Sequence, residues 1–247
     1  MNGKKINIAT PDGIADGYIF HPPDKGPCPG VIFYMDAFGI RPALLEMAER
    51  LSSSGYDVLL PNLFHRAGTY PPFDPKAVFK DEPERGRLMT LMRSINHGLM
   101  MRDTSAFLNY LAGQSPVGSK VGCVGYCMGG GFALAAAGAF PDRVGAAASF
   151  HGGNLATDRS DSPHLLAGKI RATVYIGVAG IDPHFPDSEK ERLQAALQAA
   201  GVRHQLEVYP AARHGFTMTD LPVYDRQASE RHWQRLLHLF HEAGLQA

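Results

Sequence analysis

The sequence contains little cysteine, with only Cys28, Cys123 and Cys127 in 247 residues. An odd number of cysteines in a chain long enough to bury its own core argues against a disulfide framework, so we expect at least one free thiol. An excess of charge is also missing, because 24 Lys and Arg residues balance 24 Asp and Glu residues. The balance argues against a nucleic acid or an acidic membrane surface as a partner.

Long apolar runs are absent as well. Nowhere do eighteen apolar residues follow one another, and no apolar signal segment follows the two lysines of residues 1–10. We therefore expect a cytoplasmic protein without a membrane partner. Hydrophobic residues make up 45% and charged residues 19% of the chain, which excludes disordered and fibrous classes. The length favours one α/β domain over residues 1–247.

Short β-rich runs alternate with amphipathic stretches of helical length. The expected strands cover residues 7–9, 17–21, 31–34, 58–61, 120–125, 145–150, 173–178 and 205–209. The expected helices cover residues 41–53, 82–111, 128–138, 187–200 and 223–243, and a long loop is expected over 62–81. This order predicts a mostly parallel sheet with helices on both faces. Because ligands bind at the carboxyl ends of such strands, functional residues should directly follow strands.

A glycine-flanked cysteine lies between an expected strand and an expected helix. Residues 125–129 read G-Y-C-M-G, which matches the nucleophile-elbow pattern with Cys127 in place of serine. The glycines leave room for a sharp turn, and the N-terminus of the next helix lowers a thiol pKa and offers the Met128 N–H to an oxyanion. The alternative is a packing turn with a buried structural cysteine.

A thiol nucleophile needs a base, since a free thiol with a pKa of about 8.5 is only about 3% thiolate at pH 7. The chain order typical of this elbow is nucleophile, acid, histidine. Asp182 and His214 each follow an expected strand in that order. Cys127, Asp182 and His214 therefore form the predicted catalytic triad. Asp187 is a competing acid, but we interpret it as the N-cap of the next helix.

At this point the sequence resembles the dienelactone hydrolase family of α/β-hydrolases over almost its whole length. The likeness lies in the segments VIFYMDAFGI, LSSSGYDVLLPNLF, VGCVGYCMGGG, GID and ARHGF, in the family's order. The resemblance implies the α/β-hydrolase fold, a Cys-His-Asp triad, and hydrolysis of a small-molecule ester or enol-lactone through a thioester acyl-enzyme. No cofactor and no metal are implied, because acyl transfer through a triad needs neither.

The resemblance also assigns roles to the loop after the third strand. An acidic residue there contacts the resting thiol in the family, and the matching residue is Asp36, one methylene shorter than the glutamate of the archetype. The N–H groups of Ala37 and Met128 would form the oxyanion hole. The alternative for Asp36 is a cap of the following helix. Met218 stands where the archetype has a substrate-binding arginine, so a different acyl or leaving group is expected.

Several further residues are candidates for substrate contact. They are Tyr34, Phe38, His65, Arg66 and Arg213, with ordinary core or solvated surface as the alternative for each. We interpret His151 in the HGG segment as a tight turn near the rim of the pocket. His232, His238 and His241 in the last expected helix suggest metal only superficially, since no acidic or cysteine ligand joins them.

Other functions remain open. One is a carboxylesterase or thioesterase of broader specificity on the same fold, and another is a non-catalytic binding protein that keeps the hydrolase pocket. A redox pair of Cys123 and Cys127 is disfavoured, because its spacing differs from C-x-x-C and leaves Asp182 and His214 unexplained. The sequence leaves the choice between a monomer and a small homo-oligomer open.

Overall fold

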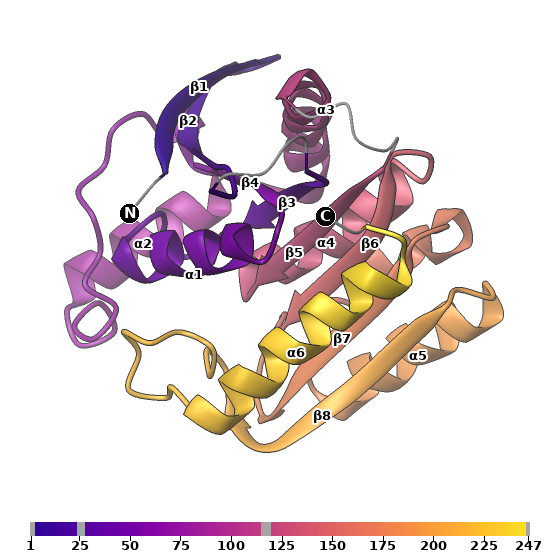
Figure 1. Ribbon diagram of the computed structural model, residues 1–247. Coiled ribbons are helices and arrows are strands. Elements are labelled where there is room, and N and C mark those ends of the chain that lie inside the picture. The colour runs from indigo at the N-terminus through magenta and orange to yellow at the C-terminus, as the bar shows by residue number, and fades with distance from the viewer. Residues whose placement is uncertain (1–2, 24–27, 115–119, 246–247) are drawn as a thin grey trace.

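The computed structural model describes residues 3–23, 28–114 and 120–245, and it joins their strands into one sheet of eight. The strands are β1 (Lys4–Thr10), β2 (Gly13–Phe20), β3 (Gly30–Tyr34), β4 (Asp57–Pro61), β5 (Val121–Tyr126), β6 (Val144–Phe150), β7 (Thr173–Ile181) and β8 (His204–Arg213). Their order across the sheet is β1-β2-β4-β3-β5-β6-β7-β8 (Figure 1). β1 and β2 are antiparallel to their neighbours, and from β4 to β8 the pairs are parallel.

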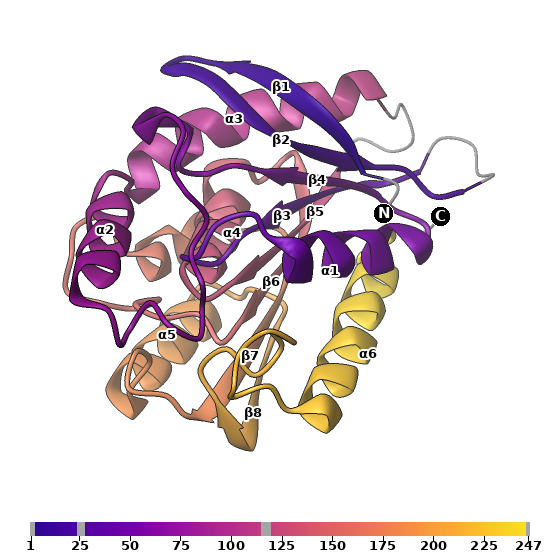
Figure 2. The ribbon, with the colours of Figure 1, turned by 90° about the vertical axis from the view of Figure 1, so that its left-hand side faces the viewer.

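Helices cover both faces of this sheet, as the alternating pattern predicts. They are α1 (Pro42–Ser53), α2 (Glu82–Arg93), α3 (His97–Gln114), α4 (Met128–Ala139), α5 (Asp187–Ala199) and α6 (Arg226–Glu242), with 3₁₀ helices η1 (His65–Ala67) and η2 (Pro163–Lys169). Figure 2 shows α1 and α6 on one face and α3, α4 and α5 on the other. Among the described helices, none combines the length and apolar composition that crossing a bilayer requires. The predicted α/β class is confirmed.

The central strands and α4 pack unusually closely. Every residue of β3 and β6 is buried, as expected of parallel strands covered on both faces. α4 consists largely of glycine and alanine, and its residues 129–138 are all buried. At Gly138 an added Cβ would lie 2.5 Å from the Cβ of Leu166 in η2, so a side chain there would push the two elements apart. Small residues therefore hold the helix that follows Cys127 tightly in place.

The single helix predicted over 82–111 is wrong. The chain breaks at residues 94–96 into α2 and α3. Asn96 explains the break, because its side-chain Oδ1 accepts a hydrogen bond from the N–H of Leu99 at 2.9 Å and so caps the start of α3. The apolar periodicity continues across this cap, which is why the pattern alone indicated one helix.

Both edges of the sheet depart from the predicted strand limits. β1 and β2 are longer than 7–9 and 17–21, since they pair from Lys4 opposite Ile19 to Thr10 opposite Gly13. β7 and β8 continue past residues 178 and 209. Ala179 pairs with Tyr209 and Ile181 with Arg213, so three residues of β8 lie opposite one of β7. Asp182 and His214 directly follow this bulge, which therefore sets the direction in which the two strands end.

Candidate active site

Cys127 lies at the turn between β5 and α4, at the carboxyl end of the central strand. Its φ of 54° is in the left-handed region, where a residue other than glycine is strained. The neighbouring glycines have no room for a side chain. A Cβ on Gly125 would lie 1.9 Å from the carbonyl oxygen of Gly129, and one on Gly129 would lie 2.4 Å from that of Tyr34. The half-buried thiol therefore sits on the tight, strained turn that the pattern predicts.

We expect Gly125→Ala to destabilise the protein by about 3 kcal/mol or more, at the upper end of the range for overpacking. The obstacle is backbone, so no flexible side chain can move aside. Urea unfolding measures the change. Gly86→Ala in α2 is the matched control, since nothing lies within 4 Å of its Cβ and alanine favours a helix by up to about 1 kcal/mol. Equal stability of Gly125→Ala and wild type would refute the prediction.

Asp182 and His214 meet at the ends of β7 and β8. The Nδ1 atom of His214 lies 2.7 Å from Oδ2 of Asp182, and Oδ1 of Asp182 accepts a hydrogen bond from the backbone N–H of His184 at 2.9 Å. The Asp182 side chain is 1% exposed and that of His214 22%. Gly180 makes this arrangement possible, because a Cβ there would lie 2.3 Å from the carbonyl oxygen of Pro210 in the bulge.

The competing acid, Asp187, lies outside this arrangement. Its side chain is 89% exposed and accepts a hydrogen bond from Lys190 at 2.7 Å. The predicted N-cap role is also wrong, because Pro186 occupies the cap position and Asp187 is the first residue of α5. Between the two candidate acids, the structure joins His214 to Asp182.

The imidazole of His214 is also within hydrogen-bonding reach of Cys127. Burial by itself would lower the pKa of His214, but the charge on Cys127 and the carboxylate of Asp182 outweigh it and raise that pKa to about 10. Since Nδ1 is bonded to Asp182, Nε2 remains for the sulfur. The three side chains thus place a sulfur nucleophile, an imidazole base and a carboxylate in series, an arrangement suited to nucleophilic attack.

We expect the ring proton signal of His214 to titrate well above the ordinary midpoint of about 6.5, toward 10. In Cys127→Ala the midpoint should fall, because the negative charge is gone. Since the folded-state pKa is raised, this contribution to stability is complete below about pH 6.5 and is lost as the pH rises through about 10. NMR checks this, with the signal assigned by its loss in His214→Gln. A wild-type midpoint near 6.5 would contradict the predicted pair.

Two further histidines pack against His214. The ring centroid of His151 lies 5.3 Å and that of His184 4.9 Å from the centroid of His214, both edge to face. His151 follows β6, has φ 39° and is only 1% exposed, and its Nε2 lies 2.8 Å from the hydroxyl of Thr217. Burial and the neighbouring His214 keep the pKa of His151 well below its usual value.

The chain turns sharply at His151, as the sequence analysis expects, but the ring is buried and packs against the ring of His214. The signal that could have found it is its place directly after a parallel strand, which is the same criterion that selected Asp182 and His214.

Asp36 is buried, but its partners differ from those expected. Its two carboxylate oxygens accept hydrogen bonds from Arg41 at 2.7 and 2.9 Å, and one of them also accepts the N–H of Phe38 at 3.0 Å. Within the described chain, no hydrogen bond joins this carboxylate to Cys127. The cap alternative is wrong as well, since the N-cap residue of α1 is Arg41 and no side chain caps this helix through a hydrogen bond. Burial raises the pKa of Asp36, and Arg41 opposes the rise.

The candidate oxyanion donors flank the sulfur along the chain and across the sheet. Met128 follows Cys127 and begins α4, so its N–H belongs to the free N–H groups of a helix start. Ala37 is buried in the loop after β3, the strand that pairs with β5. A Cβ on Gly129 would contact the carbonyl oxygens of both Tyr34 and Met35, which shows how closely that loop approaches the elbow.

Three of the predicted substrate-binding residues are engaged elsewhere. Tyr34 is fully buried, with its hydroxyl 2.8 Å from that of Thr104. His65 lies 3.0 Å from the buried carboxylate of Asp103, and Arg66 binds the same carboxylate at 2.6 and 2.7 Å. Tyr34 in β3 and His65 and Arg66 in η1 are thus all bound to side chains of α3, so these three residues are not available to a substrate.

Phe38 and Arg213 keep their candidacy. Phe38 is 9% exposed and packs edge to face against Phe79, with 5.8 Å between ring centroids. Phe79 itself is 60% exposed, an unusual position for a large aromatic ring, and the sequence analysis missed it. Arg213 is exposed at the end of β8, beside His214, and no ion pair involves it in the part of the chain that the structure describes.

The histidines of α6 do not form a metal site. His232 is fully buried, with its Nε2 3.0 Å from the hydroxyl of Tyr126, while His238 and His241 are exposed. Across residues 3–23, 28–114 and 120–245, no group of three or more His, Cys, Asp or Glu side chains is arranged so that it could hold a metal ion. His232 is thus a core residue.

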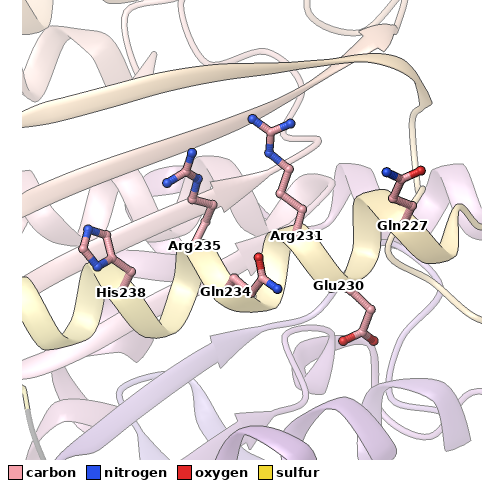
Figure 3. A pocket seen from close by; sticks show the side chains of 6 residues that line it. All are labelled: Gln227, Glu230, Arg231, Gln234, Arg235 and His238. Carbon is pink, nitrogen blue, oxygen red and sulfur yellow. The ribbon is translucent and has the colours of Figure 1, made fainter.

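A surface depression of about 670 Å³ lies along α6 (Figure 3). Its lining side chains are Gln227, Glu230, Arg231, Gln234, Arg235 and His238. Arg231 and Arg235 both pair with Glu207 of β8, at 2.5 and 2.8 Å. Their charges are thus partly neutralised, and none of the candidate catalytic residues lines this depression.

Comparison with known proteins identifies the family. The model of the dienelactone hydrolase family matches residues 15–244. A putative carboxymethylenebutenolidase of Synechocystis is 28% identical over 91% of this chain and 90% of its own length, and the carboxymethylenebutenolidase of Pseudomonas putida is equally similar over the same shares. The crystal structure of a putative dienelactone hydrolase from Klebsiella pneumoniae superposes with a TM-score of 0.85 at 23% identity, covering 97% of this chain and 98% of that one. The chain is therefore a hydrolase with the α/β-hydrolase fold, and it belongs to the dienelactone hydrolase family.

Proposed function

We propose that the protein hydrolyses small-molecule activated esters, such as enol-lactones and aryl esters, through a thioester on Cys127. The observation that carries the proposal is the hydrogen bond between His214 and Asp182, with Cys127 close enough to His214 to raise its pKa. The names of the curated relatives, carboxymethylenebutenolidases, support a lactone as one substrate.

In the first half of the reaction, the sulfur of Cys127 attacks the carbonyl carbon of the ester. A carbon–sulfur bond forms, and the carbonyl π electrons move to the oxygen, where the N–H groups of Ala37 and Met128 stabilise the charge. When this intermediate collapses, the bond to the leaving oxygen breaks. The proton on Nε2 of His214 goes to that oxygen, and an acyl thioester remains.

In the second half, His214 takes a proton from water, and the resulting hydroxide equivalent attacks the thioester carbon. Collapse of this intermediate breaks the carbon–sulfur bond, releases the carboxylic acid and returns the thiolate beside the imidazolium. Asp182 keeps Nδ1 protonated throughout and stabilises the positive charge. No step requires a metal or an organic cofactor.

The thiol sets the substrate class. A thiolate is a better leaving group than an alkoxide, so the first intermediate expels sulfur unless the leaving oxygen is weakly basic. Enolates, phenolates and thiolates are leaving groups of low enough basicity, whereas the alkoxides of simple alcohols and the anions of amines are not. Activated esters, lactones and thioesters should therefore react, and alkyl esters and amides should react slowly.

A series of acetates with one acyl group tests this proposal. We expect kcat/KM to rise from ethyl to phenyl to p-nitrophenyl acetate, with a burst of nitrophenol and an acyl adduct of the protein in intact mass. A preference for the alkyl ester would contradict the leaving-group argument and favour a broader carboxylesterase. Neither turnover nor adduct, with an enol-lactone included in the screen, would favour a non-catalytic binding protein.

The redox alternative has no structural support. Cys123 is fully buried in β5, and burial raises the pKa of its thiol to about 12. A thiol that stays protonated and inaccessible is a poor partner for thiol–disulfide exchange.

A further inference from the structure

Arg41 connects two loops that lie far apart in the sequence. Its Nη1 and Nη2 atoms donate to the two carboxylate oxygens of Asp36 at 2.7 and 2.9 Å. Its Nε and Nη2 atoms donate to the carboxylate of Asp220 at 2.6 and 3.2 Å, and Nη1 also reaches the carbonyl oxygen of Gly39 at 3.3 Å. All five N–H groups of the guanidinium are thus used, in a side chain that is 5% exposed.

On one side, the guanidinium holds the loop between β3 and α1. Asp36 binds it and also accepts the N–H of Phe38, which folds the backbone around Ala37. The ring of Phe38 lies under the guanidinium, 5.3 Å from ring centroid to Cζ, and Gly39 accepts through its carbonyl. The segment that carries the Ala37 N–H is therefore fixed at three points by one side chain.

On the other side, Asp220 belongs to the loop between β8 and α6, which begins at His214. Successive turns lock this loop, with backbone hydrogen bonds from Met218 to Gly215 at 3.0 Å and from Leu221 to Met218 at 3.1 Å. A third bond joins the N–H of Asp225 to the carbonyl of Phe216 at 3.0 Å. Asp220 is consequently held in a short, rigid connection to the histidine.

We propose that Arg41 is a positioning residue that sets the oxyanion-hole loop at Ala37 against the histidine loop at His214. The inference rests on the proposed function, since it assumes that Ala37 donates to the oxyanion. An oxyanion donor acts only when it lies about 2.7–3.1 Å from the developing charge, and a misplacement of about 1 Å costs up to roughly 10²-fold in rate. The position of Asp182 on β7 keeps His214 aligned with Cys127 independently of this link.

Asp220→Asn tests the proposal without leaving a buried charge unpaired. Asp220 is 28% exposed, and its loss keeps the Asp36–Arg41 pair. We expect the acylation rate with p-nitrophenyl acetate to fall roughly 10- to 10²-fold, with KM little changed. The rate of Cys127 alkylation by iodoacetamide, which needs no oxyanion hole, should stay within about twofold of wild type. Asp220→Glu, which keeps a carboxylate, should recover part of the acylation rate.

Glu230→Gln is the matched control. Glu230 forms a similar two-pronged pair with Arg50, at 2.7 and 2.6 Å, on the outer surface of α1 and α6. Its loss should leave acylation and alkylation unchanged. Thermal melting accompanies each variant, and a purely structural role of Asp220 would lower the melting temperature while acylation per folded molecule stayed at the wild-type value.

A second variant tests the buried Asp36–Arg41 pair itself. Arg41→Met combined with Asp36→Asn removes both charges of the buried ion pair, because removing only one would leave the other buried and unpaired. Asp220 also loses Arg41 in this variant, but its carboxylate is 28% exposed and stays accessible to solvent. The same split between slowed acylation and normal alkylation is expected. Acylation of Asp220→Asn within about twofold of wild type would overturn the positioning role alone, whereas the absence of any wild-type acyl-enzyme would overturn the proposed function.

Discussion

Replacement of Cys127 by alanine is expected to abolish the acyl-enzyme and to lower kcat with p-nitrophenyl acetate at least about 10⁴-fold. Without the sulfur no covalent intermediate can form, and the remaining oxyanion donors and His214 assist only direct attack by water. Burst kinetics and intact mass measure the two effects. The fold should survive, since the side chain is half-buried at the surface end of the elbow.

Cys123→Ala is the control for this prediction. It removes a thiol only four residues away, but one that is buried in β5 and hydrogen-bonded to Tyr34. Some stability should be lost, while the burst and the adduct remain. An adduct that persists in Cys127→Ala, or disappears in Cys123→Ala, would place the nucleophile elsewhere.

Asp182→Asn is expected to lower kcat by about 10²–10⁴-fold. The carboxylate now fixes Nδ1 of His214 as the donor and supports the imidazolium, and an amide does neither reliably. The pKa of His214 should fall in the variant, because one of the groups that raise it is lost. Steady-state kinetics over a range of pH measures both changes.

Asp187→Asn provides the comparison, because it makes the same chemical change five residues along the chain. Its carboxylate is 89% exposed and paired with Lys190, so kcat should stay at the wild-type value. A large loss with Asp187→Asn and little with Asp182→Asn would reverse the assignment of the acid.

Much of the fold could be predicted from the sequence because its local signals agree with its tertiary structure. The strand β3 is a continuous apolar run, and the glycines at positions 125 and 129 mark a tight turn because neither position has room for a side chain. The helix over 82–111 shows the limit. Hydrophobic periodicity does not reveal a single capping side chain, so the pattern predicts one helix where Asn96 begins a second one.

The substrate-binding residues could be predicted far less well, since a polar residue near a strand end has many potential partners. Their position near a strand end makes His65 and Arg66 plausible substrate contacts, but both side chains bind Asp103, nearly forty residues later in the chain. Asp36 was expected at the thiol, but Arg41 holds it. In each case a neighbouring charge decided the outcome. Asp103 belongs to α3, and Arg41 lies five residues along the same loop as Asp36, where sequence spacing does not tell which nearby group the carboxylate binds.

The sequence by itself determined the α/β class, the succession of strands and helices along the chain, the elbow at Cys127 and the choice of Asp182 and His214 as candidates. These features follow from short-range rules, in which hydrophobic pattern, steric room and position after a strand act over a few residues. Only the tertiary structure decided the β8 bulge, the buried ring of His151 behind His214 and the link from Asp36 through Arg41 to Asp220. These contacts join residues up to 179 positions apart, and burial makes the link through Arg41 specific, because a buried charge must find its partner wherever the fold brings one near.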